Sequence, residues 1–455
     1  MENISYARMF VLLWVALYVV IFVQIYIDWA SVTFFYLGFP YVYNLRDSTI
    51  AYCVIGAFAF LLPISVKRYS DFACWMLYLT IFIPSIIIAA RQGYTSFDAS
   101  WLIIAVAVSF WLVLYIPKII RFKSYSLIRQ ISVAKFFFFF LSFYVIAIAF
   151  YIATYRGMMS FSGMDEIYEQ RARFGSAQTS TLALYLTGWL SNAMNPYLLA
   201  VGLFDRTRRW AIVVGLAGQI VVFMAFAGKM MLVILIVTFG FYFFVLNNKA
   251  HIAPARLAFG FAALTFSALA ILIATDYQPV GTAMDAVALI YIRTLGIQGA
   301  MTGVYADVFS HNPFTYWSHV NIINLIIDYP YKVPLGYVAG TDLIGGTGFN
   351  ANANFWATDG VAAYGLAGVV IMGAVLGLVL SLANKVVTPD RLPFAATVSI
   401  PFIMSLGNSS LFTSLITGGG LIMVMMIAYG VPQRQPTLKK EAVYRFHATP
   451  SRVSK

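Results

Sequence analysis

Long apolar runs recur along the whole chain and are separated by short polar segments. A helix needs about 20 apolar residues to cross a bilayer, and twelve runs reach or approach that length. They lie near residues 9–27, 49–66, 72–90, 99–116, 133–154, 181–204, 210–227, 230–247, 257–275, 360–384, 391–407 and 411–430. This pattern predicts an all-α polytopic membrane protein with about twelve transmembrane helices.

The composition agrees with the pattern. Of the 455 residues, 61% are apolar and 10% are charged, against roughly a quarter charged in ordinary soluble domains. A soluble chain of this length has no means of burying that much apolar surface. The composition therefore excludes a cytosolic enzyme, a secreted domain and a disordered chain.

Basic residues divide unevenly between alternate connecting segments. With a cytoplasmic N-terminus, 21 of the 29 Lys and Arg residues fall on the inner side and 12 of the 17 acidic residues on the outer side. This split follows the positive-inside rule. It predicts that both termini are cytoplasmic and that residues 1–431 form a single transmembrane domain. Residues 432–455 are expected to form a basic cytoplasmic tail, either solvated or at lipid headgroups. The net charge of +12 needs no nucleic-acid partner.

Two connecting segments on the outer side are unusually long. They span residues 155–180 and residues 276–359. Most connections in compact domains are short, and long loops usually carry function. We therefore expect the functional residues in these two periplasmic loops.

The few basic residues on the outer side are candidates for an anion site. Arg171 and Arg173 lie in the first loop, Lys229 lies between two apolar runs, and Arg293 lies in the second loop. Arginine suits phosphate because its fork offers several donors and keeps its charge. The alternatives are a surface ion pair between Glu169 and Arg173 and contact of Lys229 with lipid headgroups.

The stretch 290–303 in the second loop has helical spacing. Gly296, Gly299, Ala300 and Gly303 recur three or four residues apart, and Arg293 falls on the same predicted face. Small residues on one face allow either a bulky ligand or a neighbouring helix to approach closely. The pattern leaves both alternatives open.

Further candidates lie in the same loop. His319 is a candidate base, and Trp317 either stacks on a sugar ring or lies at the membrane interface. Asp359 is a second candidate base, with capping of the following helix as the alternative. Asn350, Asn352 and Asn354 alternate, so an extended chain would point all three the same way.

No pattern indicates a metal or nucleotide. The chain has no zinc-type cluster of His and Cys residues, no phosphate-binding loop motif and no nucleophile-elbow motif. We therefore expect no metal and no cofactor. An enzyme without a metal ion or a nucleotide needs a substrate that already carries a good leaving group.

Two segments resemble a known family. The stretch NANANFWATDGVAAYGLAGVVI (350–371) resembles the loop-to-helix signature of Wzy-type bacterial oligosaccharide repeat-unit polymerases, which make O-antigen and exopolysaccharide. FAGKMMLVILIV (226–237) is similar to the family's helix start, with Lys229 in the basic position. Some members carry an Arg followed eleven positions later by Gly in both loops, and none of the loop arginines here has that spacing.

The resemblance implies a fold and a reaction. The fold would be a membrane architecture like that of GT-C glycosyltransferases, in the bacterial inner membrane with its active site facing the periplasm. A sugar hydroxyl of one undecaprenyl-pyrophosphate-linked repeat unit would attack the anomeric carbon of another, and undecaprenyl pyrophosphate would leave. Cations stabilise the growing charge on that leaving group.

The resemblance also suggests roles for the candidates. Lys229, Arg293 and one of the pair Arg171 and Arg173 would bind the pyrophosphates. His319 is the first choice of base and Asp359 the second. The remaining candidates, Trp317, Asn350, Asn352 and Asn354, would bind the glycan. Expected partners are the lipid-linked glycans, membrane lipid, a chain-length regulator and a flippase.

Three other functions compete with the polymerase. An O-antigen ligase would share the cation site and present a different acceptor cleft. A flippase or transporter of lipid-linked oligosaccharides would place cations inside the helical bundle. A scaffold of an export complex would need no buried anion site.

Overall fold

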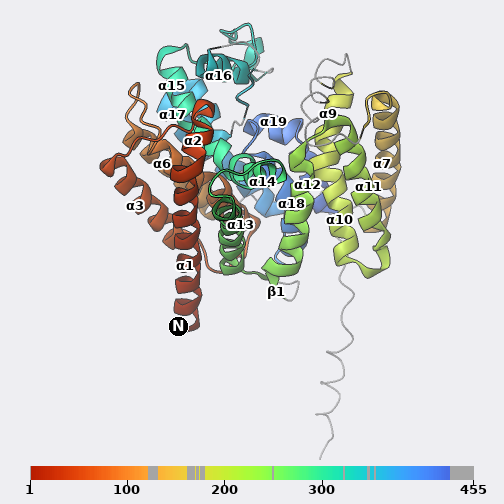
Figure 1. Cartoon of the computed structure of the whole chain (residues 1–455). Helices are drawn as coiled ribbons and strands as arrows, with labels where there is room; N and C mark the ends of the chain where they lie inside the picture. Colours follow the sequence, from red (N-terminus) through yellow and green to blue (C-terminus); the bar gives the residue numbers. More distant parts are fainter. Residues whose placement is uncertain are drawn as a thin grey trace, which may run out of the picture.

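The computed structural model describes most of the chain and is almost entirely helical (Figure 1). It describes residues 2–120, 132–160, 170, 174, 180–247, 251–320, 323–345, 349–352 and 355–430. Within these ranges the strands are β1 (Leu246–Asn247) and β2 (His251–Ile252), an antiparallel pair of two residues each.

The helices before residue 160 coincide with the first five apolar runs. They are α1 (Glu2–Ile25), η1 (Tyr26–Ala30), α2 (Ser31–Thr33), η2 (Phe35–Leu37), α3 (Leu45–Leu61), α4 (Tyr69–Leu77), η3 (Tyr78–Phe82), α5 (Ile83–Ala89), α6 (Ala99–Ile119) and α7 (Val133–Tyr155).

The helices between residues 180 and 280 coincide with the next four runs. They are α9 (Thr181–Trp189), η5 (Leu190–Met194), α10 (Asn195–Phe204), η6 (Arg206–Arg208), α11 (Trp210–Phe226), α12 (Lys229–Gly240), η7 (Phe241–Val245) and α13 (Pro254–Ala274).

The last part of the chain holds the helices that surround the candidate site. They are α14 (Thr282–Val287), η8 (Ala288–Gly296), α15 (Ile297–His311), η9 (Ile323–Leu325), α16 (Leu335–Ile344), α17 (Trp356–Val386), α18 (Leu392–Ser405), α19 (Leu411–Ile416) and α20 (Gly420–Tyr429).

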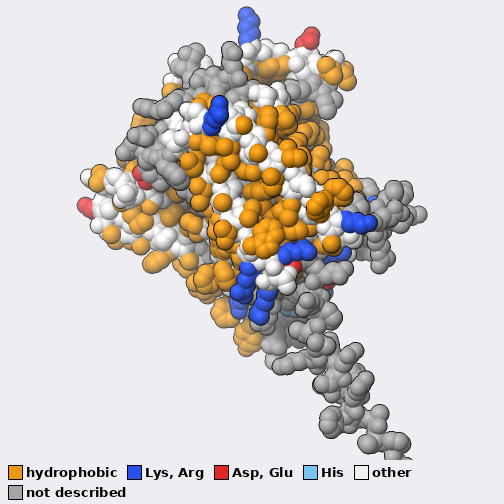
Figure 2. Space-filling view, turned by 90° about the vertical axis from the view of Figure 1, so that its right-hand side faces the viewer, with side chains coloured by type: hydrophobic (Ala, Val, Ile, Leu, Met, Phe, Trp, Pro, Cys, Tyr) orange, Lys and Arg blue, Asp and Glu red, His pale blue; other side chains and the backbone are white. Residues whose placement is uncertain are grey.

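Length and composition identify a multi-pass membrane protein. Within the described ranges, seven helices are long and apolar enough to cross a membrane, and four shorter apolar helices accompany them. Figure 2 shows hydrophobic side chains spread broadly over one face, with Lys and Arg gathered below them. The all-α polytopic membrane fold is confirmed, whereas the number of twelve spans and their direction stay predictions.

The segment predicted as the second long loop is largely helical. Its helices α14, η8 and α15 form one run, Thr282–His311, which is itself long and apolar enough to cross a membrane. Scattered polar residues such as Asp285 and Gln298 obscured this helix in the hydropathy pattern. Gln298 is buried between helices, where protein rather than lipid surrounds it.

Pairs of long helices form the core. Helix α17 lies along α6, α1 lies along α13, and α10 lies along α11. Figure 1 shows α1, α3 and α6 on one side and α7, α9, α10 and α11 on the other, with α18 and α19 between them. The Phe82 ring of η3 and the Phe110 ring of α6 stack with centroids 4.5 Å apart. Phe110 also stacks on Trp356 at the start of α17.

Candidate functional site

Helix α17 is broken near its N-terminal end. Tyr364 (φ −159°, ψ 33°) and Gly365 (φ 60°, ψ −146°) leave the helical conformation. Only glycine adopts the Gly365 conformation without strain. The residues on either side then approach each other, since a Cβ on Gly360 would stand 2.4 Å from the carbonyl oxygen of Gly368. The Tyr-Gly-Leu-Ala-Gly motif thus marks a sharp bend.

A loop from the preceding segment fills this break. The backbone N–H of Thr315 donates to the carbonyl of Ala362 at 2.8 Å, and that of Tyr316 donates to Ala363 at 3.0 Å. A broken helix leaves carbonyls without their usual partners, and such groups need others when they are buried. The break therefore serves as a docking point for loop 312–320.

The docked loop is strained. Tyr316 (φ 47°) and Trp317 (φ 61°) both have positive φ. Such conformations cost bulky residues free energy and persist where the surroundings enforce them. Strained backbone of this kind gathers at active sites and ligand clamps, so the loop is a candidate functional element.

The loop brings His319 against Asp359. The Nε2 atom of His319 lies 2.8 Å from Oδ1 of Asp359, and the two side chains are 10% and 0% exposed. Thr315 Oγ1 lies 3.1 Å from Nδ1 of the same ring. The two residues proposed from sequence as alternative bases are thus a hydrogen-bonded pair.

Asp359 faces His319 from the first turn of α17. The hydrogen bond at the helix start comes from Thr358, whose Oγ1 accepts from the Phe355 N–H at 2.8 Å. Asp359 is also the acidic residue of the first turn, where a negative charge suits the helix dipole. A carboxylate beside an imidazole holds the ring in one orientation and stabilises its charged form.

Thr315, His319 and Asp359 form a hydroxyl–imidazole–carboxylate chain. The same order of groups transfers protons in hydrolases. Here the hydroxyl is fully buried, and it also lies 3.2 Å from the Ala362 carbonyl oxygen. Thr315 is therefore suited to positioning the ring. Of the three side chains, only His319 has an exposed edge that a substrate can reach. The sequence did not single out Thr315, although its spacing of four from His319 was a usable signal.

A second His–Asp pair lies nearby on the surface. His311 Nε2 stands 3.3 Å from Asp342 Oδ2, with side chains 52% and 32% exposed. Burial raises the pKa of the Tyr331 phenol, and the Asp342 charge raises it further. This exposed pair has the same chemistry as the buried pair and makes a natural control for it.

Aromatic rings stand exposed beside the strained loop. Tyr316 and Tyr364 are 46% and 50% exposed, with centroids 5.9 Å apart, and Phe314 lies beside both. Trp317 is half-buried, and its indole N–H donates to the Met372 sulfur at 3.2 Å. The open aromatic surface is therefore formed by the tyrosines rather than by Trp317.

The asparagine segment packs against α16. The Ala351 N–H donates to the Gly336 carbonyl at 2.8 Å, and Ala351 is buried while Asn350 and Asn352 are exposed. This alternation is the one expected for an extended chain. Asn354 lies outside the described residues.

The small-residue face of α15 is a helix-packing surface. A Cβ on Gly299 would stand 2.6 Å from the Pro84 carbonyl oxygen, and one on Gly303 would meet the Gln92 side chain. These contacts favour the packing alternative for this face. Arg293 is exposed instead, because it lies in the π-helical η8, whose extra residue per turn rotates it away from the glycines.

Among the described residues, Arg293 and Lys229 belong to elements other than those that hold the His–Asp pair. Helix η8 contacts α12, and Lys229 is the first residue of α12. Arg293 precedes Tyr305, an electrostatic neighbour of Asp359, by twelve residues, or on the order of 18 Å along a helix. Arg171 and Arg173 lie outside the described residues.

In the described part of the chain, no three His, Cys, Asp or Glu residues gather closely enough to hold a metal ion. Comparison of the chain with models of protein families, with curated proteins and with solved structures finds no match.

Proposed function

We propose that this chain is a membrane glycosyltransferase that polymerises oligosaccharide repeat units carried on undecaprenyl pyrophosphate, at the periplasmic face of the bacterial inner membrane. The observation that carries the proposal is the contact between His319 and Asp359. A strained loop and a broken helix hold this pair beside exposed tyrosines. Such an arrangement suits proton transfer from a sugar hydroxyl.

The reaction needs one base and one stabilised leaving group. The hydroxyl oxygen of the acceptor sugar attacks the anomeric carbon of the donor. The bond from that carbon to the pyrophosphate oxygen breaks, and its electron pair leaves with undecaprenyl pyrophosphate. The base takes the hydroxyl proton, so the step needs no oxidant or reductant.

His319 is the proposed base and Asp359 its positioning partner. Asp359 faces Nε2, so Nδ1 is the nitrogen that takes the proton. The Thr315 hydroxyl lies against Nδ1 and has the Ala362 carbonyl as a second acceptor. Once Nδ1 holds the proton, its N–H donates to the Thr315 oxygen while the Thr315 hydroxyl donates to the Ala362 carbonyl, so the contact that orients the ring is kept.

The separation of the cations from the pair suggests their role. A leaving pyrophosphate must lie next to the carbon under attack, whereas Arg293 is on the order of 18 Å along the helix from Tyr305, the neighbour of Asp359. The acceptor also carries a pyrophosphate, a few sugar rings from its reacting hydroxyl. We therefore assign Arg293 and Lys229 to the acceptor, which leaves Arg171 or Arg173 for the donor.

Exposed groups near the pair are suited to the glycan. Asn350 and Asn352 offer amide donors and acceptors, and Tyr316 and Tyr364 offer ring faces. Carbohydrate rings present apolar C–H faces and polar hydroxyl edges, so both kinds of contact are needed. Trp317 supports the loop through Met372.

A reconstitution assay tests the proposal. Purified protein in detergent is mixed with the lipid-linked repeat unit, EDTA and no nucleotide, and the products are separated on a gel. We expect a ladder of polymers. Transfer only after addition of lipid A core would identify a ligase, and no transfer to either acceptor would contradict the proposal.

The two His–Asp pairs provide a matched control. Asp359→Asn keeps the size of the side chain and removes the charge that orients His319, so we expect the rate to fall by about 100-fold or more. Asp342→Asn makes the same change in the exposed pair and should leave the rate within about twofold. Equal rates for the two variants would rule out a role for the buried pair.

A further inference from the structure

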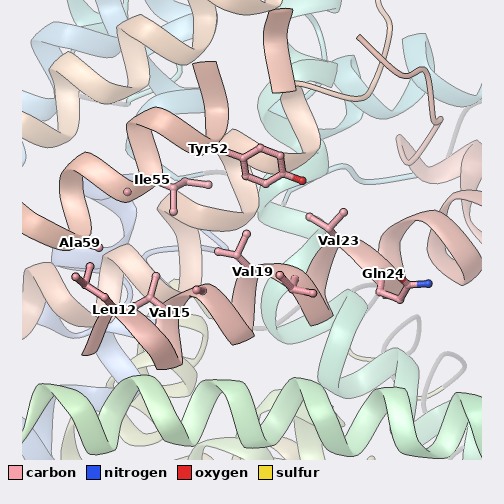
Figure 3. Close-up of a pocket in the computed structure, with 11 residues that line it drawn as sticks. Leu12, Val15, Val19, Val23, Gln24, Tyr52, Ile55 and Ala59 are labelled. Carbon is pink, nitrogen blue, oxygen red and sulfur yellow. The ribbon is translucent and has the colours of Figure 1, made fainter. Parts of the chain in front are cut away.

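An apolar groove runs between α1 and α3 (Figure 3), and none of its lining residues belongs to the site described above. Its volume is about 510 Å³. Eleven residues line it, seven from α1 and four from α3: Leu12, Val15, Ala16, Val19, Val20, Val23, Gln24, Tyr52, Ile55, Gly56 and Ala59. The lining is mostly aliphatic, and its polar groups, Tyr52 and Gln24, lie in the half of the groove away from Leu12 and Ala59.

The groove lies on the membrane-facing surface. Val20 is 64% exposed and Tyr52 is 43% exposed, within helices whose composition suits a bilayer. From Leu12 to Gln24 the helix rises on the order of 18 Å. One leaflet of the hydrocarbon core is about 15 Å thick, so the groove has the length of a single lipid chain.

A buried cation stands behind the polar end. Arg91 is 2% exposed, and one of its guanidinium nitrogens donates to the Tyr52 hydroxyl at 2.7 Å. The guanidinium also donates to the Ile87 carbonyl at 2.9 Å and lies over the Tyr52 ring. Its buried Nε has no hydrogen-bond partner among the described residues, and these contacts supply no negative charge. Burying a charge without a counter-charge is costly. The site is therefore electrostatically complementary to an anion.

The Tyr52 hydroxyl lies between Arg91 and the groove. Its oxygen accepts the Arg91 N–H, so its own O–H proton is left to donate elsewhere. A phenol that accepts from a cation becomes a stronger donor. Gln24, in contrast, already donates its amide to Asp28, so Tyr52 is the donor at the mouth of the groove.

We propose that this groove binds a membrane phospholipid, with one acyl chain between α1 and α3 and the phosphate accepting a hydrogen bond from Tyr52, backed by Arg91. Phospholipids are the molecules with acyl chains that are present at the highest concentration beside a membrane-facing groove. The fraction of grooves that hold a ligand rises with the concentration of that ligand. The binding is independent of the proposed glycosyl transfer.

Gly56 permits a clean test. A Cβ on Gly56 would meet no heavy atom within 4 Å, so Gly56→Leu starts a side chain from an open position of the groove lining. Gly260 on α13 is equally open and lies outside the groove, so Gly260→Leu is the matched control. Both variants add the same side chain to an open position of a membrane-facing helix.

Native mass spectrometry of the full chain, released from nanodiscs of phosphatidylglycerol and phosphatidylcholine, measures the retained lipid. We expect a one-lipid adduct for the wild type and the Gly260→Leu variant. Gly56→Leu should reduce this adduct at least fivefold, and Tyr52→Phe should reduce it severalfold while the protein stays folded.

Three outcomes would overturn the proposal. They are a wild-type chain that retains no phospholipid, a Gly56→Leu variant that retains as much as the control, and an adduct from bacterial membranes with the mass of a polyprenyl phosphate. The last would assign the groove to the tail of a lipid-linked substrate. Loss of the phospholipid adduct with an unchanged polymer ladder would show that the two sites act separately.

Discussion

At the residue scale, the chemistry of His319 depends on how its ring is held. Asp359 contacts one nitrogen and Thr315 the other. The Thr315 hydroxyl is also within reach of the Ala362 carbonyl, so it ties the ring to the break in α17. A positioning residue of this kind affects the rate through the orientation of the base, and its hydroxyl is the group that matters.

We predict that Thr315→Val lowers the polymerisation rate by about 10- to 100-fold, because the ring loses its contact at Nδ1 and a buried nitrogen loses a partner. Thr315→Ser keeps the hydroxyl and should restore most of the rate. The measurement is kcat with saturating lipid-linked repeat unit. A purely structural role would instead give equal rates for the two variants once both are folded.

The proposed binding of the glycan by the exposed tyrosines can be tested separately. Tyr364→Ala removes one ring of the pair with Tyr316, and aromatic contacts contribute about 0.5–1.5 kcal/mol. We expect KM for the acceptor to rise by roughly fivefold for a loss of about 1 kcal/mol, with kcat little changed. Tyr43→Ala, at a tyrosine that is 62% exposed elsewhere, is the control. An unchanged KM would show that these rings do not contribute to binding of the acceptor glycan.

At the element scale, glycines set how closely the helices approach. The contact between α15 and α5 depends on Gly299, and the bend in α17 depends on Gly360 and Gly368. The π-helical η8 then turns Arg293 outward while α15 stays packed. One helical run thus supplies both a packing face and an exposed cation.

We predict that Gly299→Ala destabilises the protein, because its Cβ would stand 2.6 Å from the Pro84 carbonyl oxygen. Overpacking of this kind costs about 1–3 kcal/mol. Gly260→Ala, at an open helical position, should be neutral or slightly stabilising. Thermal unfolding in detergent measures both. Equal midpoints would mean that α15 and α5 are less closely packed than the structure indicates.

At the scale of the whole molecule, the helical run Thr282–His311 decides the topology. If it stays on the outer side of the bilayer, the chain has twelve spans and the charge asymmetry holds. If it crosses, every later connecting segment changes side. Its apolar composition allows either arrangement.

Cysteine labelling distinguishes the two arrangements. In a background of Cys53→Ala and Cys74→Ala, we predict that Arg46→Cys and Asn350→Cys react with a membrane-impermeant maleimide on intact spheroplasts. Lys67→Cys and Asp390→Cys should react only after permeabilisation. Reaction of Asp390→Cys, but not Asn350→Cys, on intact spheroplasts would show that the run crosses the membrane.

The sequence by itself determined the features that depend on local composition and periodicity. These include the membrane class, the helical nature of the apolar runs, the helix around residues 290–303 and the alternation of Asn350 and Asn352. Each depends on neighbours a few residues apart, and solvent or lipid acts on those neighbours directly. His319 and Asp359 were also chosen from sequence, each as a separate candidate.

Only the tertiary structure decided which candidates meet. His319 and Asp359 are 40 residues apart and come together because loop 312–320 docks on carbonyls freed by the break in α17. The outward turn of Arg293 depends on a local change of helix type, and the burial of the α15 glycines depends on α5. Long-range contacts of this kind arise from packing in three dimensions, for which hydropathy along the chain holds no signal.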